Sequence, residues 1–349
     1  NIGDDGAQLD PPIKTLFVYN SDIANCTPNS GNVRKGMMRD DLFITVHETF
    51  WTDSCMYADI ILPADTALER TDCHWAYGSW FLGINKPVIE PLGESINNTE
   101  LFRMLADKMG YVDSTDNAFT QTDEEIIKDI LLEAENEDGE RFNCLTEGID
   151  YDDVVKNGWA RASTGSKRRD FLKNGWPTPS GKIEIKCEAI TAEYPDVSPF
   201  PEYVPEINGQ YDPNKEKFPI QVLSSASHYF IGDSFQSVPR LQAMQSRPTV
   251  EISLGDAKAR GIEDGDLVRL YNDNGETYCY AVLIEGLLDG VCATQKQFKG
   301  SNTPGGLNVN NLNSEMLTDF GKSPTFYSVL VEIEKASEEM TKKAIKQGV

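Results

Sequence analysis

The stretch that decides the fold is Leu42–Arg70, which reads LFITVHETFWTDSCMYADIILPADTALER. Leu42–Val46 is almost continuously apolar and β-branched, which is typical of a strand covered on both faces in a parallel sheet between helices. A polar loop follows, and then a second short strand over Asp59–Leu62 that ends at Pro63. Parallel sheets bind ligands at the carboxyl ends of their strands. The hydrogen-bonding side chains at that end of the first strand are His47, Glu48, Thr49 and Thr52.

The preceding segment predicts a partner for this strand. Ile13–Tyr19 reads as a strand, and Asn32–Arg39 can form a short helix before the next strand, so the two strands should be parallel. Between them, Asn20, Ser21 and Asp22 place small polar side chains and backbone N–H groups at a strand end, where they could bind phosphate oxygens. An ordinary turn explains the same three residues, because all three favour turns.

Composition limits the classes of protein that fit. The chain has 349 residues, enough for two domains, and 56 acidic against 32 basic residues give a formal net charge of -24. A nucleic-acid binder would repel its ligand at that balance, and Lys167–Arg169 is the one basic cluster. No segment is apolar enough to span a membrane. The N-terminus lacks a Met and any signal-peptide pattern, and we expect it to be a cut end.

The cysteines do not form a recognisable metal or disulfide pattern. Their odd number and irregular spacing, with no CxxC pair, favour reduced thiols in a cytoplasm-like compartment. With only three histidines in the chain, a His-based metal site is also not expected. The seven cysteines are Cys26, Cys55, Cys73, Cys144, Cys187, Cys279 and Cys292.

The middle of the chain predicts mainly helices and then a surface crossing. A helix over Asn98–Met109 should bury Leu101, Leu105 and Met109 and end at Gly110. The acidic run Glu133–Glu140 should be solvated. Further predicted elements are a helix over Asp123–Glu135 capped by Thr122, a helix over Tyr151–Asn157 and a strand over Lys182–Lys186.

From about Phe218 the chain reads as a closed β-barrel with one helix, Gly255–Arg260. Gly265-Asp266 and Asn274-Gly275 are turn signals. The domain layout is therefore 1–147, an α/β domain; 148–217, a connecting segment; and 218–349, the barrel. The predicted strands are Ile220–Leu223, Thr249–Ile252, Leu267–Tyr271, Glu276–Ile284 and Val329–Ile333.

Two barrel loops offer groups suited to a polar heterocycle or a phosphate. Ser224–Tyr229 supplies hydroxyls and a histidine, and Gly305–Leu312 is rich in glycine and then in amides. A plain loop explains either one alone, and a ligand site and two plain loops both stay open for the pair.

The residues quoted so far carry a resemblance to a known family. The stretch VHETFWTDSCMYADIILPADTALER resembles the pattern of an acidic residue, Phe, Thr, then Ala-Asp, then Leu-Pro-Ala and Glu. That pattern is found in the molybdopterin-dependent oxidoreductases of the dimethyl sulfoxide reductase and formate dehydrogenase superfamily. The agreement continues through IEPLGE, Gly158-Trp159, PTPSGKIE, SSASHYFIGDSF, DAKARGIEDGDLVRLYNDNGE, GGLNVNNL and TFYSVLVEIE.

The resemblance implies the C-terminal half of such an enzyme. Its fold would be a partial Rossmann-like α/β nucleotide-binding domain followed by a six-stranded, double-psi-like barrel. The implied cofactor is molybdopterin guanine dinucleotide with Mo or W. The family's earlier half carries the metal ligand and, where one is present, a 4Fe-4S cluster, and nothing here matches that half. The implied partners are the missing N-terminal half of the polypeptide and electron-transfer subunits.

Matched to the family's positions, Asn20, Ser21 and Asp22 lie on a loop against the dinucleotide, although this chain has Asp22-Ile23 where the family has Asn-Pro. Glu48 matches the acidic residue that faces guanine, whose N1–H and N2–H groups a carboxylate can accept, and Thr52 matches a hydroxyl of the same loop. The matched barrel positions are Ser225, Ser227, His228 and Ser234 around the pterin and phosphates, Asn310 after the Gly-rich turn, and Tyr327 near the end.

The resemblance implies two-electron redox chemistry of a formate-dehydrogenase-like or S/N-oxide-reductase-like enzyme. No catalytic residue or metal ligand is matched in this chain, so we expect it to be inactive alone. Two alternatives stay open: a separate non-catalytic cofactor-binding or structural subunit, and a barrel that binds only a partner protein. The cytoplasm is the expected compartment, with export through a twin-arginine signal as the alternative.

Overall fold

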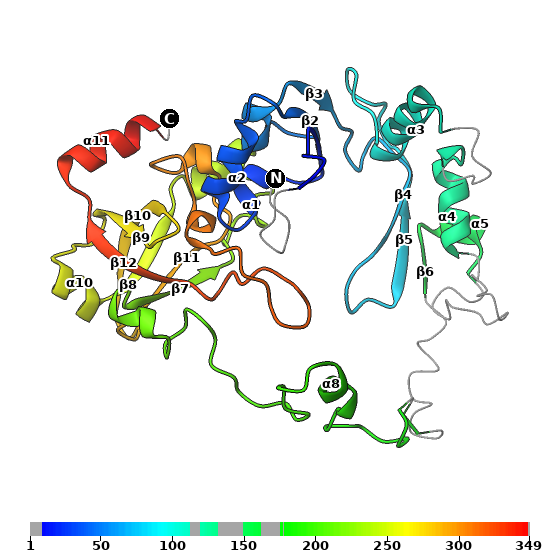
Figure 1. The fold of residues 1–349 in the computed structure, drawn as a ribbon. Helices are drawn as coiled ribbons and strands as arrows, with labels where there is room; N and C mark the ends of the chain where they lie inside the picture. The colour runs from blue at the N-terminus through cyan, green and yellow to red at the C-terminus, as the bar shows by residue number, and fades with distance from the viewer. Residues whose placement is uncertain (1–8, 112–118, 132–148, 162–174, 177, 348–349) are drawn as a thin grey trace. The chain divides into compact units, whose positions relative to one another are not determined.

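The computed structural model describes residues 9–111, 119–131, 149–161, 175–176 and 178–347 (Figure 1). It divides into unit 1, Asn1–Leu62 with Val204–Val349, and unit 2, Pro63–Tyr203, and each unit is described by itself. The domain boundaries predicted after residues 147 and 217 differ from these and stay a prediction. Three predicted features lie outside the described residues: Glu133–Glu140, Lys167–Arg169 and Cys144.

Unit 1 begins with the strand, helix, strand arrangement that the sequence predicts. Strands β1 and β2 pair in parallel, from Thr15 opposite Phe43 to Tyr19 opposite His47, and β3 completes a sheet of order β1-β2-β3. Buried Val18, Ile44 and Val46 pack against the helices between the strands. A three-stranded sheet does not by itself establish a Rossmann-like domain. The elements are β1 (Thr15–Tyr19), α1 (Ile23–Cys26), α2 (Ser30–Met37), β2 (Phe43–Glu48), the 3-10 helix η1 (Asp53–Tyr57) and β3 (Ile60–Pro63).

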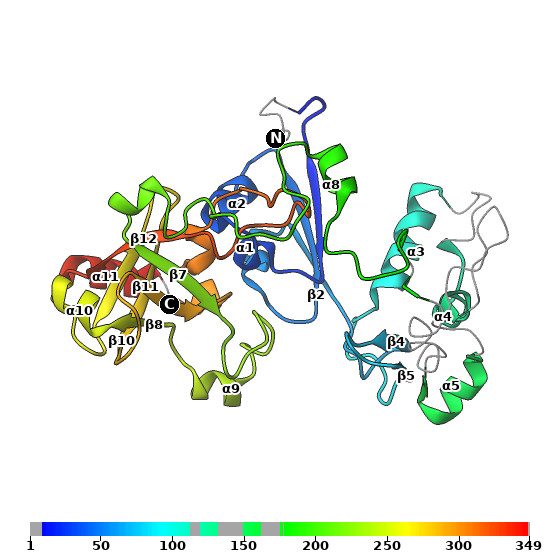
Figure 2. The same cartoon turned by 90° about the horizontal axis from the view of Figure 1, so that it is seen from below.

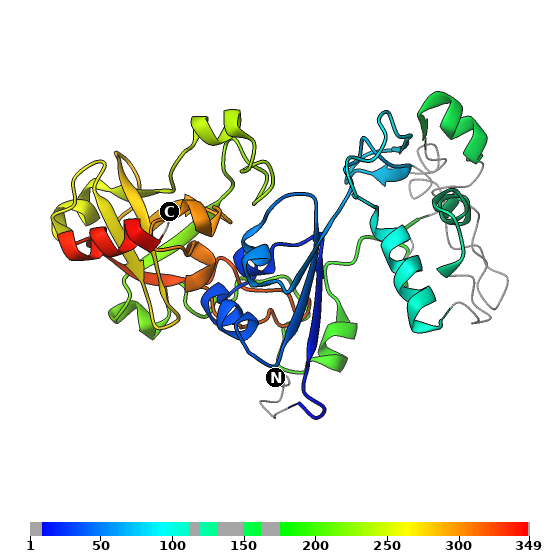
Figure 3. The same ribbon diagram turned by 90° about the horizontal axis from the view of Figure 1, so that it is seen from above.

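The second part of unit 1 confirms the predicted barrel. Six strands close in the order β10-β8-β11-β7-β12-β9, with two parallel pairs, β10 with β8 and β11 with β7. Figure 2 shows β7 and β12 side by side, and Figure 3 shows the barrel from the opposite side. The strands are β7 (Ile220–Ser225), β8 (Thr249–Ser253), β9 (Leu267–Tyr271), β10 (Glu276–Ile284), β11 (Val291–Gln295) and β12 (Leu330–Lys335).

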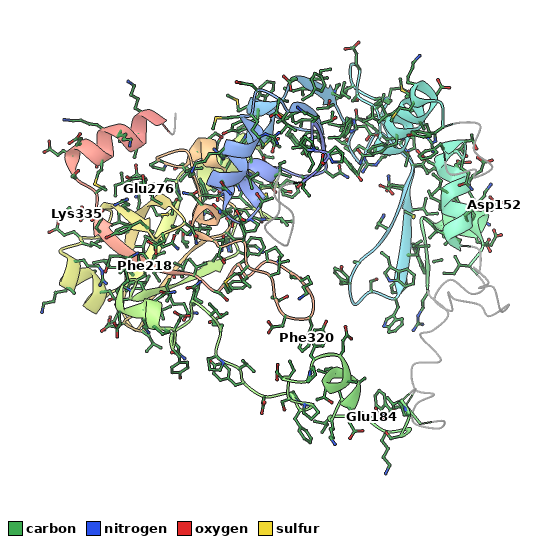
Figure 4. All side chains as sticks on the ribbon, in the orientation of Figure 1. Asp152, Glu184, Phe218, Glu276, Phe320 and Lys335 are labelled. Atoms are coloured by element: carbon green, nitrogen blue, oxygen red, sulfur yellow. The ribbon has the colours of Figure 1, made fainter. Side chains whose placement is uncertain are left out.

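Alternation and turn chemistry explain the best predicted part of the barrel, the β9–β10 hairpin. In β9 the side chains of Val268 and Leu270 are fully buried while their neighbours are partly exposed. The Asn272 side chain accepts hydrogen bonds from the backbone N–H of Asn274 and Gly275, which closes the loop. Glu276, labelled in Figure 4, begins β10 opposite Tyr271.

The predicted helix Gly255–Arg260 is confirmed, but two other features of the barrel were not predicted. Strand β11 is short and polar at one end, and its pairing with β7 and β8 comes from distant parts of the chain. Strand β7 extends to Ser225, so Ser224 and Ser225 belong to the strand and not to the loop that the sequence indicates. The helices and 3-10 turns of this part are η3 (Pro213–Glu216), α9 (Pro239–Met244), α10 (Leu254–Arg260), η4 (Gly300–Asn302), η5 (Val309–Leu312) and α11 (Glu338–Gln347).

Unit 2 is built on an antiparallel sheet of order β4-β5-β6, and Leu82, Ile84 and Val154 lie in its core. The predicted helices Asn98–Met109 and Tyr151–Asn157 are confirmed, and the one predicted over Asp123–Glu135 is confirmed as far as Leu131, beyond which its end lies outside the described residues. The Thr122 hydroxyl accepts from the backbone N–H of Glu125 as a cap should. The elements are β4 (Asp72–Trp75), β5 (Phe81–Asn85), α3 (Asn98–Met109), α4 (Asp123–Leu131), α5 (Tyr151–Asn157), β6 (Trp159–Arg161) and α8 (Glu188–Glu193).

Two predictions for unit 2 are wrong. Lys182–Lys186 forms no strand, and its apolar residues Ile183 and Ile185 are 67% and 69% exposed, because an alternating pattern does not supply a partner strand. In α3 the buried residues are Leu101 and Ala106. Leu105 and Met109, which were expected beside Leu101, are exposed.

The cysteines in the described part of the chain form no disulfide with one another. Burial in the barrel raises the pKa of Cys279 to about 12, so this thiol is not a nucleophile at neutral pH. Within the described residues, no three or more His, Cys, Asp or Glu side chains are grouped to hold a metal ion. None of the described helices has the length and apolar character needed to cross a membrane.

Candidate cofactor-binding cleft

Unit 1 contains a cleft of about 360 Å³ at the carboxyl ends of β1 and β2. Its walls come from the end of β2 and the loops after β1 and β2, from Cys26 of α1, from a loop between β7 and α9, and from Lys299. This is the position where an α/β sheet binds ligands. The lining residues are Asn20, Ser21, Asp22, Cys26, Glu48, Phe50, Trp51, Thr52, Asp233, Ser234, Phe235, Ser237, Val238 and Lys299.

The loop after β1 is fixed by the buried carboxylate of Asp22. This carboxylate accepts hydrogen bonds from the Ser54 hydroxyl (2.6 Å), the Ser54 backbone N–H (2.9 Å) and the Asp53 N–H (3.2 Å). Burial raises the pKa of Asp22, against the opposing effect of the Ser54 hydrogen bond. Asn20 begins the loop at φ 51°, a left-handed conformation that Asn tolerates. Asp22 therefore ties the two strand ends together and leaves Asn20 and Ser21 exposed in the cleft.

The last residue of β2 and the loop after it combine a carboxylate, that of Glu48, with two aromatic rings. Oε1 of Glu48 accepts from the backbone N–H of Thr49 at 2.8 Å, which orients the carboxylate. Phe50 and Trp51 follow with 57% and 61% of their surface exposed. Thr52 precedes η1, and its hydroxyl lies 3.4 Å from the Cys55 thiol. A carboxylate beside exposed rings can accept hydrogen bonds from a planar heterocycle and stack on its faces.

The opposite wall, residues 233–238, turns tightly. Gly232 and Phe235 both have positive φ, 62° and 69°, and a bulky residue in this conformation is strained. Such strain persists where the surrounding structure enforces it, often at ligand sites. Here Phe235 is exposed and lines the cleft between two serines, Ser234 and Ser237. Asp233 also lines it, and after burial its negative charge is the next cause that raises the pKa of the Cys26 thiol in α1.

Gln236 anchors this wall to the barrel. Its side chain is 2% exposed and donates to the carbonyls of Gly232 (2.9 Å) and Gln297 (2.7 Å). Its Oε1 accepts from the backbone N–H of Lys299 at 2.6 Å. The side chain of Lys299 in turn donates to the Trp51 carbonyl at 2.9 Å, so it joins the barrel to the loop after β2.

A buried set of polar groups holds the barrel against α1 and α2, and we call it the polar junction. Asn25 Oδ1 accepts from the Gly300 N–H (3.0 Å) and from Asn308 Nδ2 (2.6 Å). Arg34 donates to the Gly306 carbonyl at 2.8 Å and pairs with Asp53 at 3.1 Å. The junction consists of Asn25, Arg34, Asp53, Gly300, Gly306, Asn308 and Asn310, and it fixes the distance between the walls of the cleft.

The cleft brings together six of the residues predicted from the sequence to bind a cofactor: Asn20, Ser21, Asp22, Glu48, Thr52 and Ser234. Five others lie elsewhere. Asn310 is 2% exposed, and its amide donates to the Asn25 carbonyl in the polar junction. Ser225 donates to the Thr294 carbonyl, Ser227 donates to Gln245, His228 packs against Tyr229, and Tyr327 is exposed.

The sequence contained a signal for some of the lining residues that were missed. Phe50 and Trp51 lie between the predicted residues Glu48 and Thr52, so two adjacent aromatic residues in a polar loop were the signal. The structure shows that both are exposed. Asp233 and Phe235 flank Ser234. Lys299 had no local signal, because only the barrel topology brings it to Trp51.

Two families match the chain in comparisons with known proteins. Residues 7–108 match the family described as molybdopterin oxidoreductase, and residues 220–330 match the molydopterin dinucleotide binding domain. The probable oxidoreductase YoaE of Bacillus subtilis is 34% identical over 329 residues, which are 94% of this chain and 45% of that protein. Dimethyl sulfoxide reductase DmsA of Escherichia coli is 27% identical over 94% of this chain and 42% of its own length.

A trimethylamine-N-oxide reductase of Haemophilus influenzae is 27% identical over 81% of this chain and 35% of its own length. Among solved structures, acetylene hydratase from Pelobacter acetylenicus aligns with a TM-score of 0.71 and 19% identity, over 93% of this chain and 44% of that one. At that identity the alignment shows a shared fold only. The chain thus spans less than half the length of these relatives.

Proposed function

Because this chain belongs to the molybdopterin oxidoreductases, the superfamily of the dimethyl sulfoxide reductases, we propose that its cleft binds the guanosine end of a molybdopterin guanine dinucleotide. The observation that carries the proposal is the position of Glu48 beside Phe50 and Trp51 in the cleft at the carboxyl ends of β1 and β2. The predicted fold of this region, a partial Rossmann-like domain joined to a double-psi-like barrel, is part of the same proposal.

The lining residues suit a guanine nucleotide. Guanine presents two adjacent donors, N1–H and N2–H, and a carboxylate accepts both. One oxygen of Glu48 is held by the Thr49 N–H, and the aromatic neighbours offer stacking surfaces. Ser21, Ser234 and Ser237 supply hydroxyls for the ribose and phosphates. The volume of about 360 Å³ falls within the range of about 300–1,000 Å³ for small-molecule pockets.

When bound, the cofactor supplies two-electron redox chemistry at its metal, Mo or W, while the protein binds and orients it. We assign this chain the binding of the nucleotide end and no catalytic residue or metal ligand. We further propose that turnover needs the rest of a longer polypeptide, which carries the metal ligand and, where present, a 4Fe-4S cluster. The short coverage of the relatives supports this. We also propose electron-transfer subunits as its partners.

For the reaction class, we propose reduction of an S-oxide or N-oxide. The names of two relatives, a dimethyl sulfoxide reductase and a trimethylamine-N-oxide reductase, support this branch over the formate-dehydrogenase-like one. Reading the gene upstream distinguishes this proposal from a separate non-catalytic subunit. An in-frame continuation with a metal-ligand motif supports the enzyme, and an initiation codon directly before residue 1 contradicts it.

The identity of the bound nucleotide tests the function. The full-length protein that contains this sequence is purified with its cofactor, the cofactor is hydrolysed in acid, and the released nucleotide is identified by chromatography. We expect GMP, because a carboxylate pairs with the two donors of guanine. Release of CMP in place of GMP would contradict the proposal, since cytosine presents an acceptor at the position where guanine presents N1–H.

A further inference from the structure

The charge of the cleft does not match the charge of a dinucleotide. Three carboxylates line it, those of Asp22, Glu48 and Asp233, and the chain as a whole has a formal net charge of -24. A pyrophosphate brought into such a site is repelled unless a cation lies close by. Of the lining residues in the described part of the chain, Lys299 is the only cationic one.

We propose, on the basis of the function assigned above, that Lys299 is the residue that binds the pyrophosphate of the dinucleotide. An ammonium has three N–H donors. One is directed to the Trp51 carbonyl at 2.9 Å, the single acceptor recorded for it among the described residues, so two are available for phosphate oxygens. The Trp51 carbonyl thus holds the ammonium at the edge of the cleft without neutralising it.

The backbone of Lys299 is fixed before any ligand binds. Its N–H donates to buried Gln236 at 2.6 Å, and its carbonyl accepts from the Thr303 hydroxyl at 2.9 Å. The next residue, Gly300, is held by Asn25 in the polar junction. Because so little motion is left to the backbone, binding a phosphate costs mainly the ordering of one side chain.

The hydrogen bonds of Gln236 hold Lys299 and the serines Ser234 and Ser237 around the same cleft. Gln236 lies in the wall that carries Ser234 and Ser237, and it holds that wall and Lys299 through opposite ends of one amide group. Glu48, the last residue of β2, takes the base. The nucleotide would therefore lie with its guanine at Glu48 and its phosphates between Lys299 and the serine wall.

The test compares a nucleoside, its diphosphate and the diphosphate group alone as ligands of the full-length protein produced without its cofactor. Affinities for guanosine, GDP and inorganic pyrophosphate are measured by calorimetry for wild type, Lys299→Gln, Lys299→Arg and Lys296→Gln. Lys296 is the matched control, because it follows the same strand, β11, but does not line the cleft. Unchanged guanosine binding shows that a variant is folded.

We expect Lys299→Gln to weaken GDP and pyrophosphate binding by about 10–100-fold and to leave guanosine binding unchanged. Lys299→Arg should retain most of the GDP affinity, Lys296→Gln should match wild type, and the difference should shrink at high salt. If wild type prefers GDP to guanosine and Lys299→Gln keeps that preference, the assignment of Lys299 is overturned and the proposed function stands. If pyrophosphate binding depends on Lys299 but guanosine does not bind, the assignment stands and the guanine proposal fails.

Discussion

Asn308→Ala should be the most destabilising substitution of a polar residue in unit 1, lowering the free energy of unfolding by about 3–5 kcal/mol. The two N–H groups of its Nδ2 are shared among three acceptors, the Asn25 carbonyl (3.1 Å), Asn25 Oδ1 (2.6 Å) and the Phe298 carbonyl (2.8 Å), and its Oδ1 accepts from the Asn310 N–H (2.9 Å). All these groups are buried, so the substitution leaves several of them without a partner and without water.

Chemical denaturation measures this loss against a matched control. Asn32→Ala removes another asparagine that joins the two parts of unit 1, but Asn32 is exposed, and the hydrogen bond that its side chain donates goes to exposed Glu315 at 2.9 Å. A surface change of this kind should alter stability by less than about 0.5 kcal/mol. Equal losses for the two variants would contradict a junction that is held by buried polar groups.

Two glycines give the same junction an independent check. A Cβ at Gly300 would meet the Asp53 carboxylate and the Gly306 carbonyl, both at 2.7 Å, so Gly300→Ala should destabilise by about 1–3 kcal/mol. At Gly36, inside α2, a Cβ meets nothing within 4 Å. Gly36→Ala should therefore stabilise the protein by about 0.5–1 kcal/mol. Opposite signs for the same chemical change are expected only if Gly300 is a point of close approach.

Glu48→Gln should remove the preference of the cleft for guanine, with a loss of about 10–100-fold in guanosine affinity. Glutamine keeps the acceptor for the Thr49 N–H, so the loop after β2 should stay in place. Its NH2 group, however, would face a donor of the base, and the charge-assisted bonds are lost. Inosine lacks the N2 amino group, so wild type should bind it about 10-fold more weakly than guanosine, and the variant should bind the two alike.

Calorimetric titration with guanosine and inosine measures both effects in the full-length protein. Glu315→Gln is the control, because Glu315 is an exposed glutamate of unit 1 that does not line the cleft. If Glu48→Gln kept the wild-type ratio of guanosine to inosine affinity, Glu48 would not read the base.

Structural features that depend on residues close together in the sequence were predicted, and those that depend on residues far apart were not. The β9–β10 hairpin was predicted well, because alternation and the Asn-Gly turn act over a few residues. Strand β11 was missed because its partners β7 and β8 are distant in sequence. The strand predicted over Lys182–Lys186 does not form, because the alternating pattern is present there but no neighbouring strand pairs with it.

The same difference in range applies to the cleft. Asn20 and Ser21 were found because they directly follow a predicted strand, and Glu48 and Thr52 because they lie in the polar segment after the next predicted strand. Asn310 was matched to a cofactor contact, but the structure uses its amide to hold α1 against the barrel, which no local pattern could show. The predicted cofactor contacts of the barrel residues outside the cleft stay a prediction.

Amide hydrogen exchange in the full-length protein, measured with and without the cofactor, tests most directly whether this cleft holds the dinucleotide. We predict that the cofactor slows exchange in residues 20–22, 48–54 and 233–238, which form the walls of the cleft. Unit 1 has a second hollow of about 610 Å³, with Lys35, Asn274 and Leu307 among its lining residues. Protection confined to that hollow, with unchanged exchange in the three wall segments, would contradict the assignment.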